Sequence, residues 1–381
     1  MKRRDFLSKA TLGTLAAGTI LSGCNDKSCD TDSATTASPS PASKTTSNEV
    51  IKWKMVTTWP KNFPGLGTGA NNLAEKINTL SAGRMEVKVY GAGELVPALE
   101  IFDTVSRGTA QMGHGAAYYW KGKNEVFQFF STVPFGLTAQ EMNGWLYNGG
   151  GLELLQKAYA SHNIIPMPAG NMGVQMGGWF NKEINSLSDL NGLKMRIPGL
   201  GGEVFKRAGG TPVNLPGGEL FTAMQSGTID AVEWVGPYND LAFGFYKVAK
   251  FYYYPGWHEP GTTLEAMINK QAFEALPKDL QSIVKTACKI ANHEMLAEYT
   301  ARNNDALQTL VNKHHVQVRR FPDDVLDKLR TLSDQVVKEV AQKDAFATEV
   351  YESFSRYRDK AVNWSEYSER AYLNIRASKN P

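Results

Sequence analysis

Residues 101–115, IFDTVSRGTAQMGHG, align without a gap on residues 220–234, LFTAMQSGTIDAVEW. The two stretches share one phenylalanine and a Gly-Thr pair, and each has the pattern of a short helix, a turn at the glycine and a short strand. Three identities in fifteen positions do not establish a duplication. They predict two equivalent helix–turn–strand units, one in each of two lobes.

The segments around both units alternate between strand and helix patterns. Strands are predicted at 50–59, 85–90, 110–113, 180–184, 194–197 and 229–233. Helices are predicted at 66–80, 99–105, 202–208 and 218–225, and then at 280–314, 323–343 and 346–376. This order predicts an α/β fold, in which helices cross over between strands of a sheet, followed by long C-terminal helices.

The ends of the equivalent strands are the candidate binding surface, because ligands of open α/β sheets gather beyond the carboxyl ends of the strands. These ends are His114-Gly115, followed by Tyr118 and Tyr119, and Glu233-Trp234. Two lobes that present such ends to each other enclose a cleft, which is the geometry of hinge-closing binding proteins.

The N-terminus has the layout of a signal peptide: a basic start, a weakly apolar stretch over 10–21 and small residues before Cys24. The adjacent Arg3 and Arg4 resemble a twin-arginine export signal. The sequence Leu-Ser-Gly-Cys at 21–24 resembles a bacterial lipobox, in which Cys24 becomes the lipidated first residue. We therefore predict a signal peptide over 1–23 and a location in the periplasm or at the outer face of the cytoplasmic membrane. An ordinary cleaved signal with a chance cysteine is the alternative.

Residues 24–49 are rich in Ser, Thr, Ala and Pro and have no apolar periodicity. Such a segment cannot bury enough apolar surface to offset the entropy of ordering it. We predict a disordered tether between a membrane anchor and a folded body.

Charge and motifs exclude several classes of function. The chain has 41 basic and 38 acidic residues; removing 1–23 takes four and one of them, which leaves 37 of each. A near-neutral chain lacks the basic footprint of a nucleic-acid-binding protein. The sequence also has no HExxH, GxSxG or Walker motif, and its three cysteines, Cys24, Cys29 and Cys288, form no metal or redox motif.

Three runs resemble the solute-binding subunits of tripartite ATP-independent periplasmic (TRAP) transporters. They are VYGAGELVPALEIFDTVSRGTAQMG at 89–113, LNGLKMRIP at 190–198 and GGELFTAMQSGTIDAVEW at 217–234. The resemblance covers about 50–335. Within the family, residues 171–175, Arg196, 233–234 and 257–259 are most similar to the branch that binds 2-oxo or 2-hydroxy monocarboxylates with a metal ion.

The resemblance implies a two-lobed periplasmic binding protein fold with the ligand cleft between the lobes. We place lobe I at 50–170 and 236–275, lobe II at 171–235 and 276–335, and a helical extension at 336–381. The implied function is to capture a small organic acid with a cation and deliver it to the membrane subunits of the transporter. Two alternatives stay open: a periplasmic metal-dependent enzyme acting on a small carboxylic acid, and a ligand-sensing subunit of a receptor.

Arg196 and a set of oxygen donors are the central site candidates. In the family the arginine at this motif grips the ligand carboxylate, and its planar fork suits two parallel hydrogen bonds; a structural ion pair is the alternative. Gln175, Glu233, the Trp234 main-chain carbonyl and Glu259 offer oxygens that suit sodium, calcium or magnesium rather than zinc or copper. The branch implies Na⁺ or Ca²⁺, which a 2-oxo or 2-hydroxy acid would chelate through two oxygens.

Other residues are candidates for the cleft wall. Tyr118 and Tyr119 could hydrogen-bond a carboxylate, but neighbours on a strand face opposite ways, so at least one should point into the core. Trp234 is a candidate for the apolar wall, and Asn171 is a weaker polar candidate. Phe245 is a wall or core residue, and His114 is expected to be structural.

The C-terminal segment carries an apolar stripe at helical spacing. It consists of Phe346, Val350, Phe354, Tyr357, Ala361, Trp364, Ser368, Ala371 and Ile375. A single helix of about 30 residues would be roughly 45 Å long, longer than one lobe should cover. This predicts a homodimer in which the helix packs on the partner subunit; folding back onto its own lobes is the alternative.

Overall fold

The computed structural model describes residues 49–377. The predicted signal peptide at 1–23, the lipidation site Cys24 and all of the predicted tether except residue 49 lie outside the described residues. Within 49–377, no helix is both long enough and apolar enough to cross a membrane.

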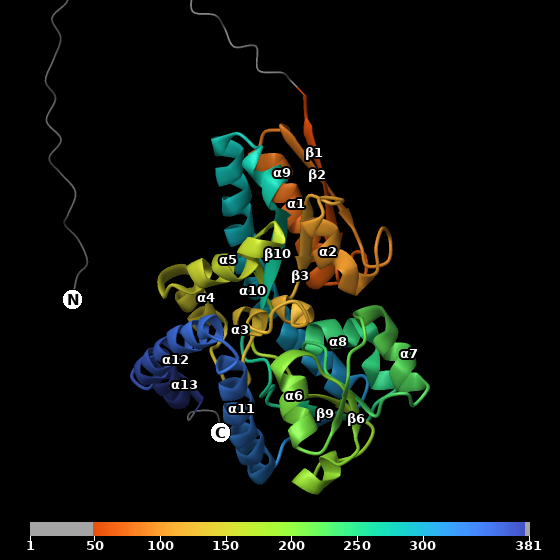
Figure 1. Ribbon diagram of the computed structural model, residues 1–381. Coiled ribbons are helices and arrows are strands. Elements are labelled where there is room, and N and C mark those ends of the chain that lie inside the picture. The colour runs from red at the N-terminus through yellow and green to blue at the C-terminus, as the bar shows by residue number, and fades with distance from the viewer. Residues whose placement is uncertain (1–48, 378–381) are drawn as a thin grey trace, which may run out of the picture. The chain divides into compact units, whose positions relative to one another are not determined.

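The first sheet has the order β2-β1-β3-β10-β4, in which four strands run in one direction and β10 runs against them (Figure 1). Its strands are β1 (Ile51–Thr57), β2 (Met85–Tyr90), β3 (Met112–Gly115), β4 (Ile164–Asn171) and β10 (Thr263–Asn269). β1 lies between β2 and β3 and is parallel to both, whereas β10 is antiparallel to β3 and β4. The predicted helix at 66–80 is confirmed as α1 (Leu66–Leu80), which connects β1 to β2 as a crossover.

The second sheet has the order β11-β9-β5-β8-β6-β7. Its strands are β5 (Gly178–Phe180), β6 (Lys194–Arg196), β7 (Thr211–Val213), β8 (Ala231–Val232), β9 (Phe251–Tyr254) and β11 (Gln317–Arg320). From β7 to β9 the five strands repeat the order and directions of the first sheet: β6 is parallel to β7 and β8, and β5 is antiparallel to β8 and β9. β11 is an additional edge strand, parallel to β9.

The two helix–turn–strand units predicted from the internal match occupy equivalent places. α2 (Ile101–Ser106) precedes β3, and α7 (Leu220–Gln225) precedes β8. Gly108 and Gly227 follow these helices with φ of 77° and 73°, a left-handed conformation that favours glycine. The shared glycine is therefore explained by the same turn geometry in both sheets.

The remaining helices pack around and between the two sheets. They are α3 (Phe127–Ser131), α4 (Ala139–Asn148), α5 (Gly151–Tyr159), α6 (Gly199–Arg207), α8 (Pro237–Phe243), α9 (Lys270–Glu274), α10 (Lys278–Asn312), α11 (Asp323–Ala341), α12 (Ala345–Ser365) and α13 (Glu369–Ala377). The 3₁₀ turn η2 (Ala117–Trp120) follows β3.

Two of the connections between the sheets are 172–177 after β4 and 255–262 before β10; a third leads from β10 to β11 through α9 and α10. The first two connections are hydrogen-bonded to each other: the Gln175 N–H donates to the Glu259 carbonyl at 3.1 Å, and the Met172 N–H to the Thr262 carbonyl at 3.2 Å. Two segments far apart in the sequence thus run together where the lobes meet.

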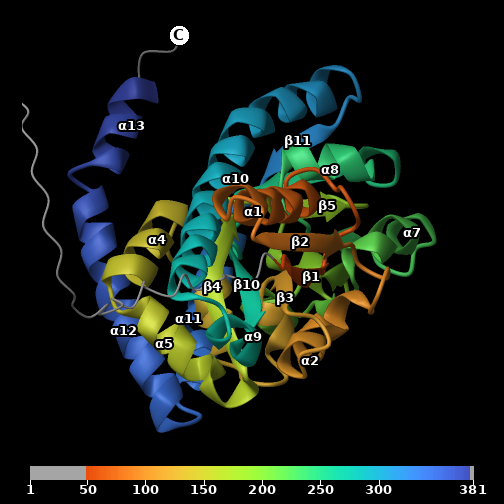
Figure 2. The same cartoon turned by 90° about the horizontal axis from the view of Figure 1, so that it is seen from above.

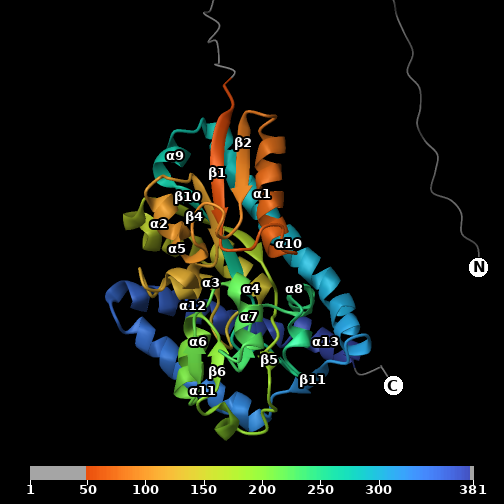
Figure 3. The ribbon, with the colours of Figure 1, turned by 90° about the vertical axis from the view of Figure 1, so that its right-hand side faces the viewer.

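This path corrects the predicted lobe boundaries. We placed 236–275 in lobe I, but β9 within it pairs with β5 of the second sheet, where Tyr252 stacks on Trp179 with ring centroids 4.1 Å apart. We placed α10 in lobe II, but it packs on β4 and α1 of the first lobe as well as on α8, and Figure 3 shows it running alongside α1. The local pattern of a segment does not indicate which sheet it joins.

A buried carboxylate in the first lobe fixes the position of η2. Glu265 on β10 is 3% exposed, and its Oε1 accepts hydrogen bonds from the Trp120 indole N–H at 2.8 Å and the Tyr159 hydroxyl at 2.6 Å. Because Trp120 is the last residue of η2, these bonds hold the turn that carries Tyr118 and Tyr119. Burial raises the pKa of Glu265 to about 7.

The C-terminal segment differs from the single long helix that we predicted. The helix breaks after Ser365, where the Tyr367 N–H bonds to the Trp364 carbonyl and the Ser368 N–H to the Ser365 carbonyl. These i→i+3 bonds form a tight turn before α13, and the Ser368 hydroxyl also bonds to the Trp364 carbonyl. The predicted start of the extension, residue 336, lies inside α11.

α12 folds back onto its own lobe, beside α4 and α5 (Figure 2). Val350 and Phe354 are buried, and Phe354 meets Trp145 edge-on at 5.2 Å. The apolar residues beyond Ala361 are exposed instead: Val362, Trp364, Tyr367, Tyr372, Leu373 and Ile375. The N-terminal part of the apolar stripe is therefore buried against the first lobe, whereas its C-terminal part lies at the surface.

We expect the stability of the protein to fall as pH rises from about 4.5 to about 7, partly because of Glu265. Its folded-state pKa is about 7 against an ordinary value of 4.5, so the unfolded chain releases this proton first and the folded state loses stability over that window. Glu265→Gln keeps an oxygen acceptor for Trp120 and Tyr159 and cannot ionise. Denaturant titrations at fixed salt with EDTA should give a shallower pH slope for the variant, and equal slopes in both proteins would contradict this assignment.

Candidate functional site

Four segments converge where the two lobes meet. Arg196 ends β6, and Glu233 directly follows the neighbouring parallel strand β8, in which Val232 lies opposite Arg196. The Glu233 N–H donates to the Arg196 carbonyl at 3.0 Å, so the pairing of the strands brings the two side chains together. The other two segments are the connections 172–177 and 255–262.

Arg196 and Glu233 form a buried ion pair. The distance from Arg196 Nη1 to Glu233 Oε2 is 3.0 Å, and the two side chains are 1% and 0% exposed. Nη1 also donates to the Glu233 carbonyl at 2.9 Å, Nε to the Leu215 carbonyl at 3.3 Å and Nη2 to the Tyr119 hydroxyl at 3.2 Å. These bonds engage four of the roughly five guanidinium N–H groups. A two-pronged grip on a carboxylate therefore requires one of these partners to move.

The charges of the site are unbalanced. Two buried carboxyl groups, Glu233 and Glu259, lie near one guanidinium, and the pKa is raised to about 7 for Glu233 by burial and to about 8 for Glu259 by burial and by Glu233. Burial alone would lower the pKa of Arg196, but Tyr119 and Glu233 raise it. Near pH 7 both carboxyl groups are therefore partly protonated in the absence of an ion, and a bound cation would stabilise their ionised forms.

Gln175 and Glu259 face each other across the two connections. The Gln175 amide Nε2 donates to Glu259 Oε2 at 2.7 Å, and the Thr262 hydroxyl donates to the same oxygen. The opposite end of the amide, Gln175 Oε1, is buried and accepts no hydrogen bond from any residue in 49–377. The amide is thus oriented with its free oxygen toward another partner.

Several buried polar atoms around Arg196 lack partners among the described residues: Gln175 Oε1, Glu233 Oε1, the Trp234 indole nitrogen and both ring nitrogens of His258. Leaving such atoms unsatisfied costs about 1–3 kcal/mol each, so a partner outside the chain is expected. The oxygens of Gln175 and Glu233 suit a hard cation. The donor set that the sequence predicted for a metal therefore fits one, with Gln175 and Glu233 as its best-placed members.

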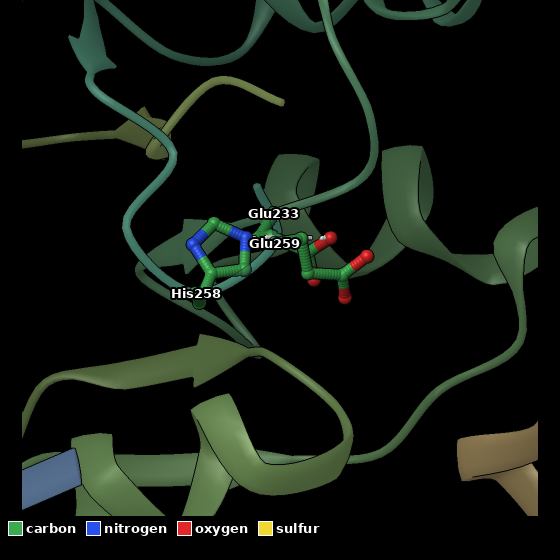
Figure 4. A group of neighbouring side chains, drawn as sticks. All are labelled: Glu233, His258 and Glu259. Atoms are coloured by element: carbon green, nitrogen blue, oxygen red, sulfur yellow. Dashed lines mark ion pairs between the residues drawn. The ribbon is translucent and has the colours of Figure 1, made fainter. Parts of the chain in front are cut away.

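His258 is a site residue that the sequence analysis missed. Glu233, His258 and Glu259 each offer one ligand atom, and these atoms lie within 4.8 Å of one another (Figure 4). Burial lowers the pKa of His258 to about 4, so its ring is neutral at pH 7. The segment Trp257-His258-Glu259 was noted for its resemblance, but a local pattern gives no sign that His258 points toward Glu233.

The tyrosines and Trp234 lie beside the ion pair. Tyr118 and Tyr119 are on the 3₁₀ turn η2 rather than on a strand, so our argument from alternating faces was wrong. Tyr119 contacts Arg196 through its hydroxyl, and the Tyr118 ring meets the Tyr119 ring edge-on at 4.8 Å. The Arg196 guanidinium lies 5.1 Å from the centre of the Trp234 ring, a cation–π contact.

Three other candidates have structural partners. Asn171 accepts from the Gly173 N–H and donates toward Gly261 and Thr263, so its side chain stabilises the start of a connection. His114 accepts from the Trp59 indole N–H at 2.8 Å and lies 3.3 Å from the Ala169 carbonyl, as expected for a structural residue. Phe245 is fully buried against Trp179 and Phe243 in the core.

A cavity of about 330 Å³ lies next to the site, between the lobes. Its lining comes from both: Tyr118, Tyr119, Lys121 and Gly122 from the first, and Ile197, Pro198, Gly199, Gly202, Glu203, Pro212, Val213 and Asn214 from the second. Tyr119 both lines this cavity and accepts a hydrogen bond from Arg196.

Comparison with known proteins gives consistent matches over most of the chain. The model of bacterial extracellular solute-binding protein family 7 matches residues 55–344. The monocarboxylate 2-oxoacid-binding periplasmic protein of Nostoc sp. is 45% identical over 328 residues, which cover 86% of this chain and 90% of that protein.

Solved structures of TRAP periplasmic solute-binding proteins are similar as well. One from Pseudoalteromonas atlantica with bound sodium and pyruvate is 44% identical with a TM-score of 0.83, over 86% of this chain and 99% of that one. One from Bordetella bronchiseptica, a dimer of mixed occupancy with calcium and picolinate, is 38% identical with a TM-score of 0.84, over 86% and 98%. The chain therefore belongs to family 7 of the bacterial extracellular solute-binding proteins, the extracytoplasmic binding subunits of TRAP transporters.

Proposed function

We propose that this subunit binds a small 2-oxo or 2-hydroxy monocarboxylate together with Na⁺ or Ca²⁺ between its two lobes. The observation that carries the proposal is the buried Arg196–Glu233 pair, together with two buried oxygens, Gln175 Oε1 and Glu233 Oε1, that have no hydrogen-bond partner in the described chain. The similar proteins are named for 2-oxoacids or hold pyruvate with sodium, or picolinate with calcium. Because the family consists of solute-binding proteins, the enzyme alternative has no support.

Arg196 would bind the carboxylate of the acid, with Tyr119 as its partner. The Arg196 Nη2 nitrogen carries two N–H groups. One donates to the Tyr119 hydroxyl, and the other is the guanidinium N–H that the bonds described above leave free. If an anion takes the place of that hydroxyl on Arg196, the phenol can donate to the anion instead. Tyr119 would then contact the ligand from the first lobe while Arg196 contacts it from the second, which links ligand binding to lobe closure.

Gln175 and Glu233 would hold the cation, with the Trp234 carbonyl and Glu259 as further oxygen donors. The cation supplies a Lewis-acid contact for the second oxygen of the acid and offsets the charge of the two glutamates. Gln175 and Glu259 lie on the connections between lobes, so cation binding would also fix how the connections meet. In this arrangement the cation and the acid would be bound together in one site between the lobes.

The first test replaces Arg196 by lysine. Arg196→Lys keeps the positive charge but loses the planar fork, so pyruvate should bind at least about tenfold more weakly in calorimetry. Arg207→Lys, at an exposed arginine paired with Glu339, is the matched control and should bind normally.

In sodium-free buffer with EDTA the parent protein should bind pyruvate more weakly, and Glu233→Ala should remove that cation dependence. Unchanged affinity in Arg196→Lys, or indifference of the parent to both cations, would rule out the corresponding role.

We further propose that Cys24 carries a lipid that anchors the protein to the outer face of the cytoplasmic membrane. The lipobox-like sequence at 21–24 supports this, and the predicted tether would give the lobes reach to the membrane subunits. Intact mass measurement after detergent extraction should show an acylated N-terminal cysteine. A mature chain with an unmodified Cys24 would contradict lipidation. The protein would then be released into the periplasm after ordinary cleavage of the signal peptide.

We also propose that two copies associate through the C-terminal half of the extension. Trp364 and Tyr367 are 65% and 78% exposed, which is unusual for large aromatic side chains in a monomer, and aromatic residues are enriched at protein interfaces. The similar Bordetella bronchiseptica structure is a dimer. We take a second copy of this chain as the partner, because in a two-fold dimer the same surface of both subunits, here the one around α13, forms the interface.

A truncation tests this association. A cut after Asp344 would remove Val350 and Phe354 from the core of the first lobe, so the informative cut is after Ala361. Light scattering should give a dimer for the mature chain and a monomer for the truncated one, with pyruvate affinity nearly unchanged. Glu352→Ala, on the exposed side of α12, is the control and should stay dimeric. A parent protein that is monomeric at micromolar concentration would refute the dimer.

A further inference from the structure

His258 differs from an ordinary buried histidine. It is 1% exposed, and neither ring nitrogen has a hydrogen-bond partner in the described chain. His114, which is equally buried, has a partner at each nitrogen, Trp59 at one and Ala169 at the other. A core histidine normally satisfies its nitrogens as His114 does, so the ring of His258 is placed for something other than packing.

The geometry places His258 at the cation site. Its Nε2 is 3.7 Å from Glu233 Oε1, which itself has no partner within 49–377. That separation is too long for a hydrogen bond. It suits two ligands of one ion, because ligand atoms about 2.0–2.6 Å from a common metal lie roughly 3–4 Å apart. In Figure 4 the ring nitrogen points toward the side of the site where the carboxylates of Glu233 and Glu259 lie.

We propose that His258 Nε2 is a direct ligand of the bound cation, so that the site accepts divalent transition metals such as Mn²⁺ and Co²⁺ in addition to Ca²⁺. This rests on the cation site of the proposed function and extends its chemistry. Na⁺ and Ca²⁺ are bound by oxygen and gain little from an imidazole, whereas imidazole suits first-row transition metals. The expectation of a purely oxygen-lined site came from Gln175, Glu233, the Trp234 main-chain carbonyl and Glu259, without His258.

The test measures metal affinity in the full mature chain and in His258→Gln, which replaces the nitrogen donor by an amide of similar reach. Both proteins carry His315→Asn, because the half-buried His314 and the exposed His315 would otherwise offer Co²⁺ a surface site. The φ angle at residue 315 is 54°, which asparagine tolerates. In calorimetry, His258→Gln should weaken Co²⁺ binding at least about tenfold and change Ca²⁺ binding by less than about threefold. His293→Gln, at an exposed histidine of α10, is the matched control and should leave both affinities unchanged.

A spectroscopic measurement on the parent protein gives a result that does not depend on how well the variant folds. Pulsed EPR of the Mn²⁺-loaded parent, prepared with ¹⁵N-labelled histidine, should detect a ¹⁵N coupling, and His258→Gln should lose it. Absence of that coupling in the parent, or equal Co²⁺ affinity in parent and variant, overturns the proposal. So does a loss of pyruvate affinity in His258→Gln that is the same with Na⁺, Ca²⁺ and Co²⁺, which would make His258 a contact of the acid. Failure of the parent to bind pyruvate with any cation would instead refute the proposed function.

Discussion

The buried pair Arg196–Glu233 is the interaction around which the site is built. Moving two charges out of water is costly, and the pair is tolerated because the guanidinium also bonds to the carbonyls of Leu215 and Glu233 and to the Tyr119 hydroxyl. Both residues end neighbouring parallel strands, so strand pairing sets their separation. Removing one member would leave the other as an uncompensated buried charge, at a cost of about 3–5 kcal/mol. The function of the site and the stability of the closed lobes therefore depend on the same contacts.

The second constraint is the repeated topology. The two sheets share a strand order, and the chain exchanges strands between them: β4 leads into β5, and β9 leads into β10. The two connections that result carry Gln175 and Glu259, whose side chains are bonded to each other. Under the proposed function, a cation held there would therefore bind to both of these connections between the lobes.

The first lobe supplies the complementary side of the site through η2. Trp120 donates a hydrogen bond to Glu265, and Tyr119, on the same turn, accepts a hydrogen bond from Arg196. The C-terminal helix α12 completes this lobe by covering α4 and α5, which is why its first half behaves as core although it follows the two lobes in the sequence. The exposed aromatic residues begin where that support ends, after Ala361.

The sequence by itself determined the elements whose causes are local. Apolar spacing located α1 and β2, and a glycine turn marked both helix–turn–strand units. Motifs placed Arg196 and Glu233 at strand ends. Tertiary structure decided which sheet β9 joins, that α10 packs on the first lobe, that Tyr118 and Tyr119 occupy a 3₁₀ turn, and that the ring of His258 points toward Glu233. The reason is physical: periodicity and turn chemistry are set by neighbours along the chain, whereas strand partners, crossing connections and buried charge pairs depend on contacts between residues far apart in it.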